Sequence, residues 1–146
     1  MAALTIVNPL EERVEPRRLL WVGPLAIAAA VAANTAVRAA ELAVLDVPDS
    51  FTPLVSPAYA IATAVGVLGA VIVFGVVAAR ARRPIAAFLK IAWGALLLSA
   101  LPDLGLLFGV PGMPPAAPVH VLALLLMHVT AFAVSVPLLI TLTRQD

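Results

Sequence analysis

Four long apolar runs, separated by short polar stretches, make up most of this chain, and they occupy residues 19–45, 54–79, 85–110 and 118–142. A helix rises about 1.5 Å per residue, so each run can cross the roughly 30 Å hydrocarbon core of a bilayer. The pattern therefore predicts an all-α integral membrane protein, a four-helix transmembrane bundle with spans at 18–45, 54–80, 84–110 and 118–142. We expect one domain, residues 18–146, preceded by a cytoplasmic segment, residues 1–17.

Composition supports a lipid environment and removes several classes of function. Hydrophobic residues make up 63% of the chain and charged residues 12%, against about 45–50% and 25% in soluble domains. The net charge of +1, without an extended basic patch, argues against nucleic acid as a partner. The absence of cysteine excludes disulfides, thiolate metal sites, iron–sulfur clusters and cysteine redox chemistry.

The positive charges are distributed asymmetrically about the four runs. The loops 46–53 and 111–118 contain no Lys or Arg. Arginines instead precede the first run, join the second to the third and follow the fourth: Arg13, Arg17, Arg18, Arg80, Arg82, Arg83 and Arg144. Because Lys and Arg concentrate in cytoplasmic segments, we expect a multi-pass protein of the cell membrane with both termini cytoplasmic.

Small residues recur at every fourth position of the second run, at Ala62, Gly66 and Ala70. Such a stripe lets helix backbones approach closely. Four antiparallel neighbours already need faces of this kind, so we interpret the stripe as internal packing rather than as a dimer motif.

Polar residues inside the apolar runs are the candidates for function, because hydrocarbon penalises them. Asn34, Arg38 and Glu41 share one face of the first helix, since residues three and four apart are neighbours on a helix. Ser99 and Asp103 share a face of the third helix by the same rule, and the fourth run carries a histidine near the middle of the membrane. The candidate intramembrane ligand site is therefore Asn34, Arg38, Glu41, Ser99, Asp103 and His128.

Two interpretations of these residues remain open. In the structural one, Arg38 pairs with Asp103 or Glu41, while Asn34 and Ser99 serve the carbonyl of Leu98, which Pro102 deprives of its helical donor. In the functional one, they line an outward-facing pocket for a small ligand, an ion or a lipid headgroup. A third possibility places Arg38 at the outer membrane boundary, with its side chain reaching the interface.

His128 also raises the question of a cofactor. It could ligate a haem or chlorin, but His120 lies about 12 Å away along the same helix and cannot supply the opposite axial ligand. A metal held by His128 and Asp103 would have only two evident protein ligands. We therefore predict no cofactor and no metal, and we interpret Tyr59, Trp21 and Trp93 as interfacial or packing aromatics.

Three short segments carry a resemblance to a known family. They are Ala33-Asn34-Thr35-Ala36-Val37-Arg38, Ser99-Ala100-Leu101-Pro102-Asp103 and Met127-His128-Val129. With these segments the chain resembles a family of bacterial four-span membrane proteins catalogued as a domain of unknown function. The resemblance covers residues 17–143 and implies the four-helix topology without implying an activity.

The sequence thus leaves two classes of function. There is no nucleophile–base pair, metal signature or phosphate-binding loop, so catalytic residues are not assigned and an enzyme is disfavoured. The favoured hypothesis is an accessory or structural subunit of a membrane complex, whose partners are membrane lipids and other membrane-protein subunits or further copies of the chain. The alternative is a protein that binds or transports a small ligand, ion or lipid headgroup through the intramembrane pocket.

Overall fold

The structure, a computed structural model, describes residues 13–109, 111 and 115–145, and every regular element within those residues is a helix. The long helices are α1 (Leu19–Val44), α3 (Ala58–Arg80), α4 (Pro84–Gly105) and α5 (Pro118–Thr143). Short helical turns accompany them: η1 (Pro16–Arg18), α2 (Thr52–Val55) and η2 (Leu106–Phe108). Four helical segments are long and apolar enough to cross a membrane, which confirms the all-helical class and the number of candidate spans. Residues 1–12 of the predicted N-terminal segment lie outside the described part.

Prolines set several helix boundaries. Pro84 and Pro118 occupy the first position of α4 and α5, where a missing N–H costs nothing and the fixed φ already suits a helix. The second span begins at Ala58 rather than at residue 54, so that predicted boundary was wrong. Ser56 is extended, with ψ of 153°, because a residue that precedes a proline is disfavoured in the helical region.

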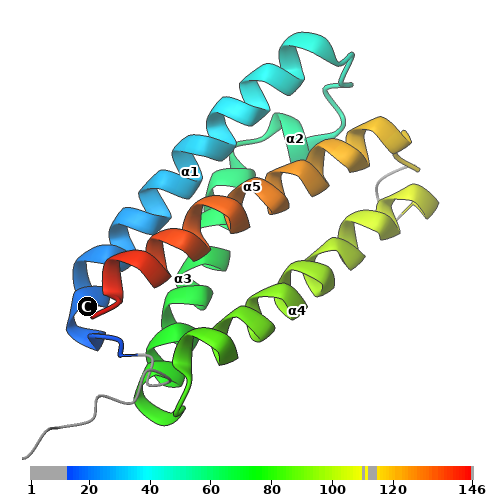
Figure 1. The fold of residues 1–146 in the computed structure, drawn as a ribbon. Coiled ribbons are helices and arrows are strands. Elements are labelled where there is room, and N and C mark those ends of the chain that lie inside the picture. Colours follow the sequence, from blue (N-terminus) through cyan, green and yellow to red (C-terminus); the bar gives the residue numbers. More distant parts are fainter. Residues whose placement is uncertain (1–12, 110, 112–114, 146) are drawn as a thin grey trace, which may run out of the picture.

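The long helices form a bundle in which α1 and α4 each pack against both α3 and α5 (Figure 1). The chain segments that precede α1 and follow α5 meet at one end of the bundle. Val14 and Arg144 form an isolated antiparallel bridge, and the Glu15 N–H donates to the Thr143 carbonyl at 2.9 Å. We call this the terminal end, and we call the opposite end, which carries α2 and η2, the loop end.

The core of the terminal end contains buried side chains from all four long helices. The rings of Phe74 and Phe88 lie 4.5 Å apart between centroids, and both residues are fully buried or nearly so. The terminal-end cluster comprises Val22, Ala26, Ala30, Val67, Phe74, Phe88, Ala92, Val136 and Leu139. It holds α3 and α4 against α1 and α5 in this half of the bundle.

The loop end has a smaller core built from fewer elements. The loop-end cluster comprises Phe51, Leu54, Ala123, Leu124 and Met127, which belong to α2, its preceding loop and α5. Within the described chain, α4 has no buried residue after Ala92. The second half of α4 is therefore loosely packed, and this is where the bundle is hollow.

Candidate functional site

A cavity of about 680 Å³ lies among the four long helices, between the two buried clusters. It is open to the surface between α3 and α4, where Ala62, Gly66 and Ala95 are exposed. It extends from Pro53 and Asp103 near the loop end to Ala70 and Val136 beside the terminal-end cluster. Its volume is within the range of about 300–1,000 Å³ that is typical of small-molecule sites. The residues that line it are Asn34, Pro53, Ala58, Tyr59, Ala62, Thr63, Val65, Gly66, Val67, Ala70, Ala92, Ala95, Leu96, Ser99, Asp103, Leu124, Met127, His128, Ala131, Phe132, Ser135 and Val136.

Small side chains on facing helices account for the cavity. The stripe of Ala62, Gly66 and Ala70 lines it, and a Cβ built on Gly66 would meet no atom within 4 Å. The predicted internal packing of this stripe is confirmed at Ala70, which packs against the terminal-end cluster, but not at Gly66. Ala95 on α4 and Ala131 on α5 also line the hollow, whereas the rings of Trp93 and Phe132, with centroids 4.6 Å apart, join α4 to α5 beside it.

One polar wall of the cavity joins α1 to α3. The Asn34 side-chain amide donates to the Thr63 hydroxyl at 2.9 Å, and that hydroxyl donates to the Tyr59 carbonyl at 2.8 Å. Asn34 is 2% exposed, and its Oδ1 accepts no hydrogen bond from any described residue. Asn34 thus connects two helices through its nitrogen while leaving an acceptor without a partner.

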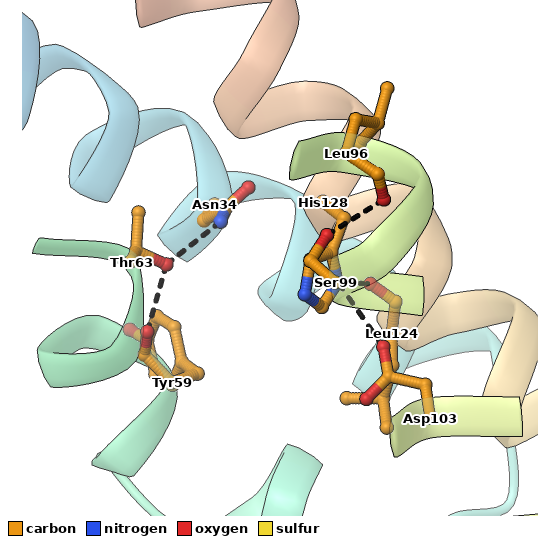
Figure 2. Close-up of polar contacts among 8 residues, drawn as sticks. All are labelled: Asn34, Tyr59, Thr63, Leu96, Ser99, Asp103, Leu124 and His128. Carbon is orange, nitrogen blue, oxygen red and sulfur yellow. Dashed lines mark hydrogen bonds and ion pairs between the residues drawn. The ribbon is translucent and has the colours of Figure 1, made fainter. Parts of the chain in front are cut away.

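The other polar wall brings α4 and α5 together. Nδ1 of His128 lies 3.0 Å from the Leu124 carbonyl oxygen and 3.2 Å from Oδ2 of Asp103. Ser99, one turn before Asp103, donates its hydroxyl proton to the Leu96 carbonyl at 2.8 Å. Figure 2 shows these side chains on one side and Asn34, Thr63 and Tyr59 on the other. The structure thus brings Asn34, Ser99, Asp103 and His128 to a single cavity.

Arg38 has a different role from the one the sequence suggested. Its Nε and one terminal nitrogen each donate to a backbone carbonyl, those of Leu54 and Val55, both at 2.6 Å. These are the last two residues of α2, where carbonyls lack helical partners and the helix dipole favours a cation. The guanidinium carbon also lies 5.0 Å from the centroid of the Tyr59 ring.

The predicted pairing of Arg38 with Asp103 or Glu41 was wrong, since no such salt bridge occurs among the described residues. Asn34 and Ser99 likewise bind Thr63 and the Leu96 carbonyl rather than the carbonyl of Leu98. Arg38 lies outside the lining of the cavity. Its fork of donors matches a pair of free carbonyls, and the short helix α2, which was not predicted, supplies them.

Glu41 is also separate from the cavity. It is 7% exposed, and neither carboxylate oxygen has a hydrogen-bond partner among the described residues. Glu41 is three residues after Arg38 on α1, but the guanidinium is turned toward α2. Glu41 therefore shares a helix face with the predicted site without contributing to its lining.

His120 lies away from the cavity, at the start of α5. Its Nε2 is 3.2 Å from the Asp46 carbonyl oxygen, and its ring packs 5.3 Å from that of Phe51. These contacts hold the 46–51 loop against α5. Across the described residues, no group of three or more His, Asp or Glu side chains is arranged to hold a metal ion.

Three polar residues that line the cavity, Tyr59, Thr63 and Ser135, were not among the predicted site residues. Tyr59 was interpreted as an interfacial or packing aromatic, yet it lines the cavity, and its hydroxyl lies 3.0 Å from that of Thr35. Ser135 lines the cavity as well. Its position seven residues after His128, two helical turns along the same face, was the available signal.

Comparisons with protein-family models, with curated proteins and with solved structures give no match for this chain.

Proposed function

We propose that this protein binds a small amphipathic molecule inside the membrane, in the cavity among α1, α3, α4 and α5. One observation carries the proposal: four of the six polar residues singled out from the sequence line one hollow of about 680 Å³. Bundles commonly build ligand sites from side chains on facing helices. The mixture of an apolar lining with a few polar groups is typical of sites for small molecules.

The cavity suits a molecule with a polar head and an apolar body. The polar groups Asn34, Asp103 and His128 lie in its loop-end half, whereas the small residues of α3 continue toward the terminal-end cluster. A headgroup would contact the polar residues, and a hydrocarbon chain would fill the space beside Gly66 and Ala70. Filling that space would restore the dispersion contacts that the lining residues lack.

We further propose that both termini face the cytoplasm and that the loop end faces outward. The support is the concentration of arginine at the terminal end and its absence from the 46–53 and 111–118 loops. Single cysteines introduced in place of Asp49 and Arg82 test this orientation in intact cells. An impermeant thiol reagent should label the first and leave the second unlabelled, and the reverse pattern would overturn the orientation.

A second candidate function is an accessory subunit of a membrane complex. Gly66 and Gly69 favour it, because a Cβ on either would meet no atom within 4 Å. A partner helix could approach such a face closely. This hypothesis makes a different prediction. A large side chain at Gly66 or Gly69 should abolish co-purification of a partner protein, and no small molecule should be involved.

Native mass spectrometry of the purified protein tests the binding proposal. The wild type should retain a small molecule of defined mass, and Gly66→Leu should lose it because the added side chain occupies the cavity. Gly69→Leu is the matched control, since Gly69 lies on the same helix in open space but does not line the cavity. It should retain the molecule.

Circular dichroism and thermal unfolding establish that both leucine variants are folded. A wild type that retains no molecule would contradict the proposal, as would equal retention by the two leucine variants. Loss of a partner protein from both variants, with no small molecule in the wild type, would instead support the accessory-subunit hypothesis.

A further inference from the structure

The cavity wall offers a ligand more free hydrogen-bond acceptors than free donors. Three of the hydroxyl groups that line it donate their protons to backbone carbonyls of their own helices, a common arrangement for Ser and Thr in helices. Their oxygens keep acceptor capacity, while their protons are already used. The donor–acceptor pairs are Thr63 to Tyr59, Ser99 to Leu96 and Ser135 to Ala131.

His128 adds another acceptor. A carbonyl oxygen can only accept a hydrogen bond, so the 3.0 Å contact between Nδ1 and the Leu124 carbonyl places the proton of the neutral ring on Nδ1. Oδ2 of Asp103, 3.2 Å from the same nitrogen, favours that arrangement. The neutral ring then presents a lone pair at Nε2, which bonds to no residue that the structure describes. Figure 2 shows this nitrogen on the side of the ring that faces Asn34 and Thr63.

With the ring of His128 neutral, the charge of the cavity wall has one sign. Neither Lys nor Arg occurs among the described residues that line it, and Asp103 contributes a carboxylate. Arg38, the cation of the predicted site, is engaged by the Leu54 and Val55 carbonyls instead. An anionic headgroup would therefore meet a carboxylate and several lone pairs without a compensating cation. A carboxylate in an apolar surrounding is stabilised by a cation close to it.

From the acceptor-rich wall and its carboxylate we infer that the cavity selects an amphiphile with a cationic, hydrogen-bond-donating head, an alkylammonium group. The ammonium N–H donates to Nε2 of His128, and Asp103, behind the ring, supplies the countercharge. The side chain of Asp103 is 15% exposed and that of His128 is 36% exposed, so the imidazole is the more accessible of the two. The hydrocarbon chain extends along the small residues of α3.

This inference rests on the proposed function and names the ligand class for the same cavity. It differs from the preference for an anionic headgroup that Arg38 would give to a site that it lined. The difference follows from the position of Arg38 outside the cavity and from the use of the hydroxyl protons within the helices.

Three probes with the same chain and different heads test the inference: dodecylamine, dodecanol and dodecanoate. The full-length protein in lipid nanodiscs is titrated with each, and bound probe is counted by native mass spectrometry. Dodecylamine should bind at least about tenfold more tightly than dodecanol, and dodecanoate should bind most weakly, because a tenfold ratio corresponds to the loss of one modest charge interaction. Equal affinity for the three probes, preference for dodecanoate, or no saturable binding of dodecylamine would overturn the inference.

Substituting one carboxylate at a time identifies the residue that supplies the negative charge for the amine. Asp103→Asn keeps the size of the side chain and should reduce dodecylamine affinity about tenfold while leaving dodecanol affinity within about twofold. Asp103→Glu should restore most of the preference for the amine. Glu41→Gln is the matched control, since Glu41 is a buried carboxylate on α1 outside the cavity lining, and its affinity for dodecylamine should equal that of the wild type.

The two proposals fail in different ways. If Gly66→Leu loses a co-purifying molecule but the three probes bind equally, the cavity is a site and its ligand is not an alkylammonium amphiphile. If Asp103→Asn and Glu41→Gln reduce dodecylamine binding equally, the charge preference does not arise from the cavity. If Gly66→Leu changes neither retention nor probe binding, the cavity is not a binding site at all.

Discussion

The two halves of the bundle are made of the same four helices, yet one half is filled and the other is hollow. At the terminal end, Phe74 and Phe88 meet ring to ring with centroids 4.5 Å apart. Toward the loop end, the facing positions on α3 and α4 are occupied by residues such as Gly66 and Ala95, and a cavity remains. Side-chain volume at the facing positions of α3 and α4 therefore distinguishes the packed half from the half that can hold a ligand.

The largest expected effect comes from breaking the packed half. Phe74→Ala should reduce the free energy of unfolding by about 3–5 kcal/mol, because a fully buried ring is removed and a void is left in its place. Phe132→Ala, at the cavity wall and partly exposed, should cost at least about 1 kcal/mol less, because less of its ring is buried even though it contacts Trp93. Equilibrium unfolding in detergent measures both values. Equal losses would contradict the contrast between the two halves.

The next effect concerns the attachment of α2 at the loop end. Arg38→Met removes two charge-assisted hydrogen bonds and leaves the Leu54 and Val55 carbonyls without these donors. It should destabilise the protein by about 1.5–3 kcal/mol. Hydrogen exchange should rise in residues 52–56 and remain unchanged near Phe74. Unchanged protection of residues 52–56 would contradict this role for Arg38.

Arg38 and Asp103 should be energetically independent, because the structure gives them separate partners. The losses in Arg38→Met and Asp103→Leu should add in the double variant to within about 0.5 kcal/mol. If the double variant recovers much of the stability lost in the single variants, the result would contradict this independence and support the ion pair suggested by the sequence. The measurement is again the free energy of unfolding, compared over the four members of the cycle.

The smallest expected effect belongs to the polar link across the cavity wall. Asn34 and Thr63 join α1 to α3 through one hydrogen bond of 2.9 Å. A double-mutant cycle with Asn34→Leu and Thr63→Val should give a coupling of about 0.6 kcal/mol, with about 1.7 kcal/mol as the upper bound for such bonds in membranes. A coupling indistinguishable from zero would show that the link contributes nothing to holding the wall together.

Much of the fold was predictable because hydropathy and proline chemistry act locally. Apolar runs identified the four candidate spans, and Pro84 and Pro118 identified where α4 and α5 begin. The start of α3 was misplaced because residues 54–57 are apolar enough to extend the run. The effect of Pro57 on Ser56 was the local signal against that extension.

The residues that line the site were more predictable from the sequence than the partners that those residues bind. Helix periodicity grouped Asn34 with Arg38 and Glu41, and Ser99 with Asp103. Both residues of the second group line the cavity, but only Asn34 of the first does. The partner of Arg38 was not predictable, because it is a pair of backbone carbonyls at the end of a short helix that hydropathy does not reveal. The hollow itself depends on the combined volumes of side chains from several helices, which no single helix pattern contains.

The most direct test of the central claim, that an amphiphile occupies the cavity, is to map where such a molecule sits. A long-chain amine with a photoreactive diazirine in its chain is incorporated with the protein into lipid vesicles, activated by light, and located by peptide mass spectrometry. We predict saturable labelling on Ala62, Gly66 or Ala70, and on Ala95 or Ala131, all of which line the cavity, and competition by unlabelled dodecylamine. Labelling confined to outward-facing positions such as Ile61, Leu68 and Leu97, without saturation or competition, would contradict the claim.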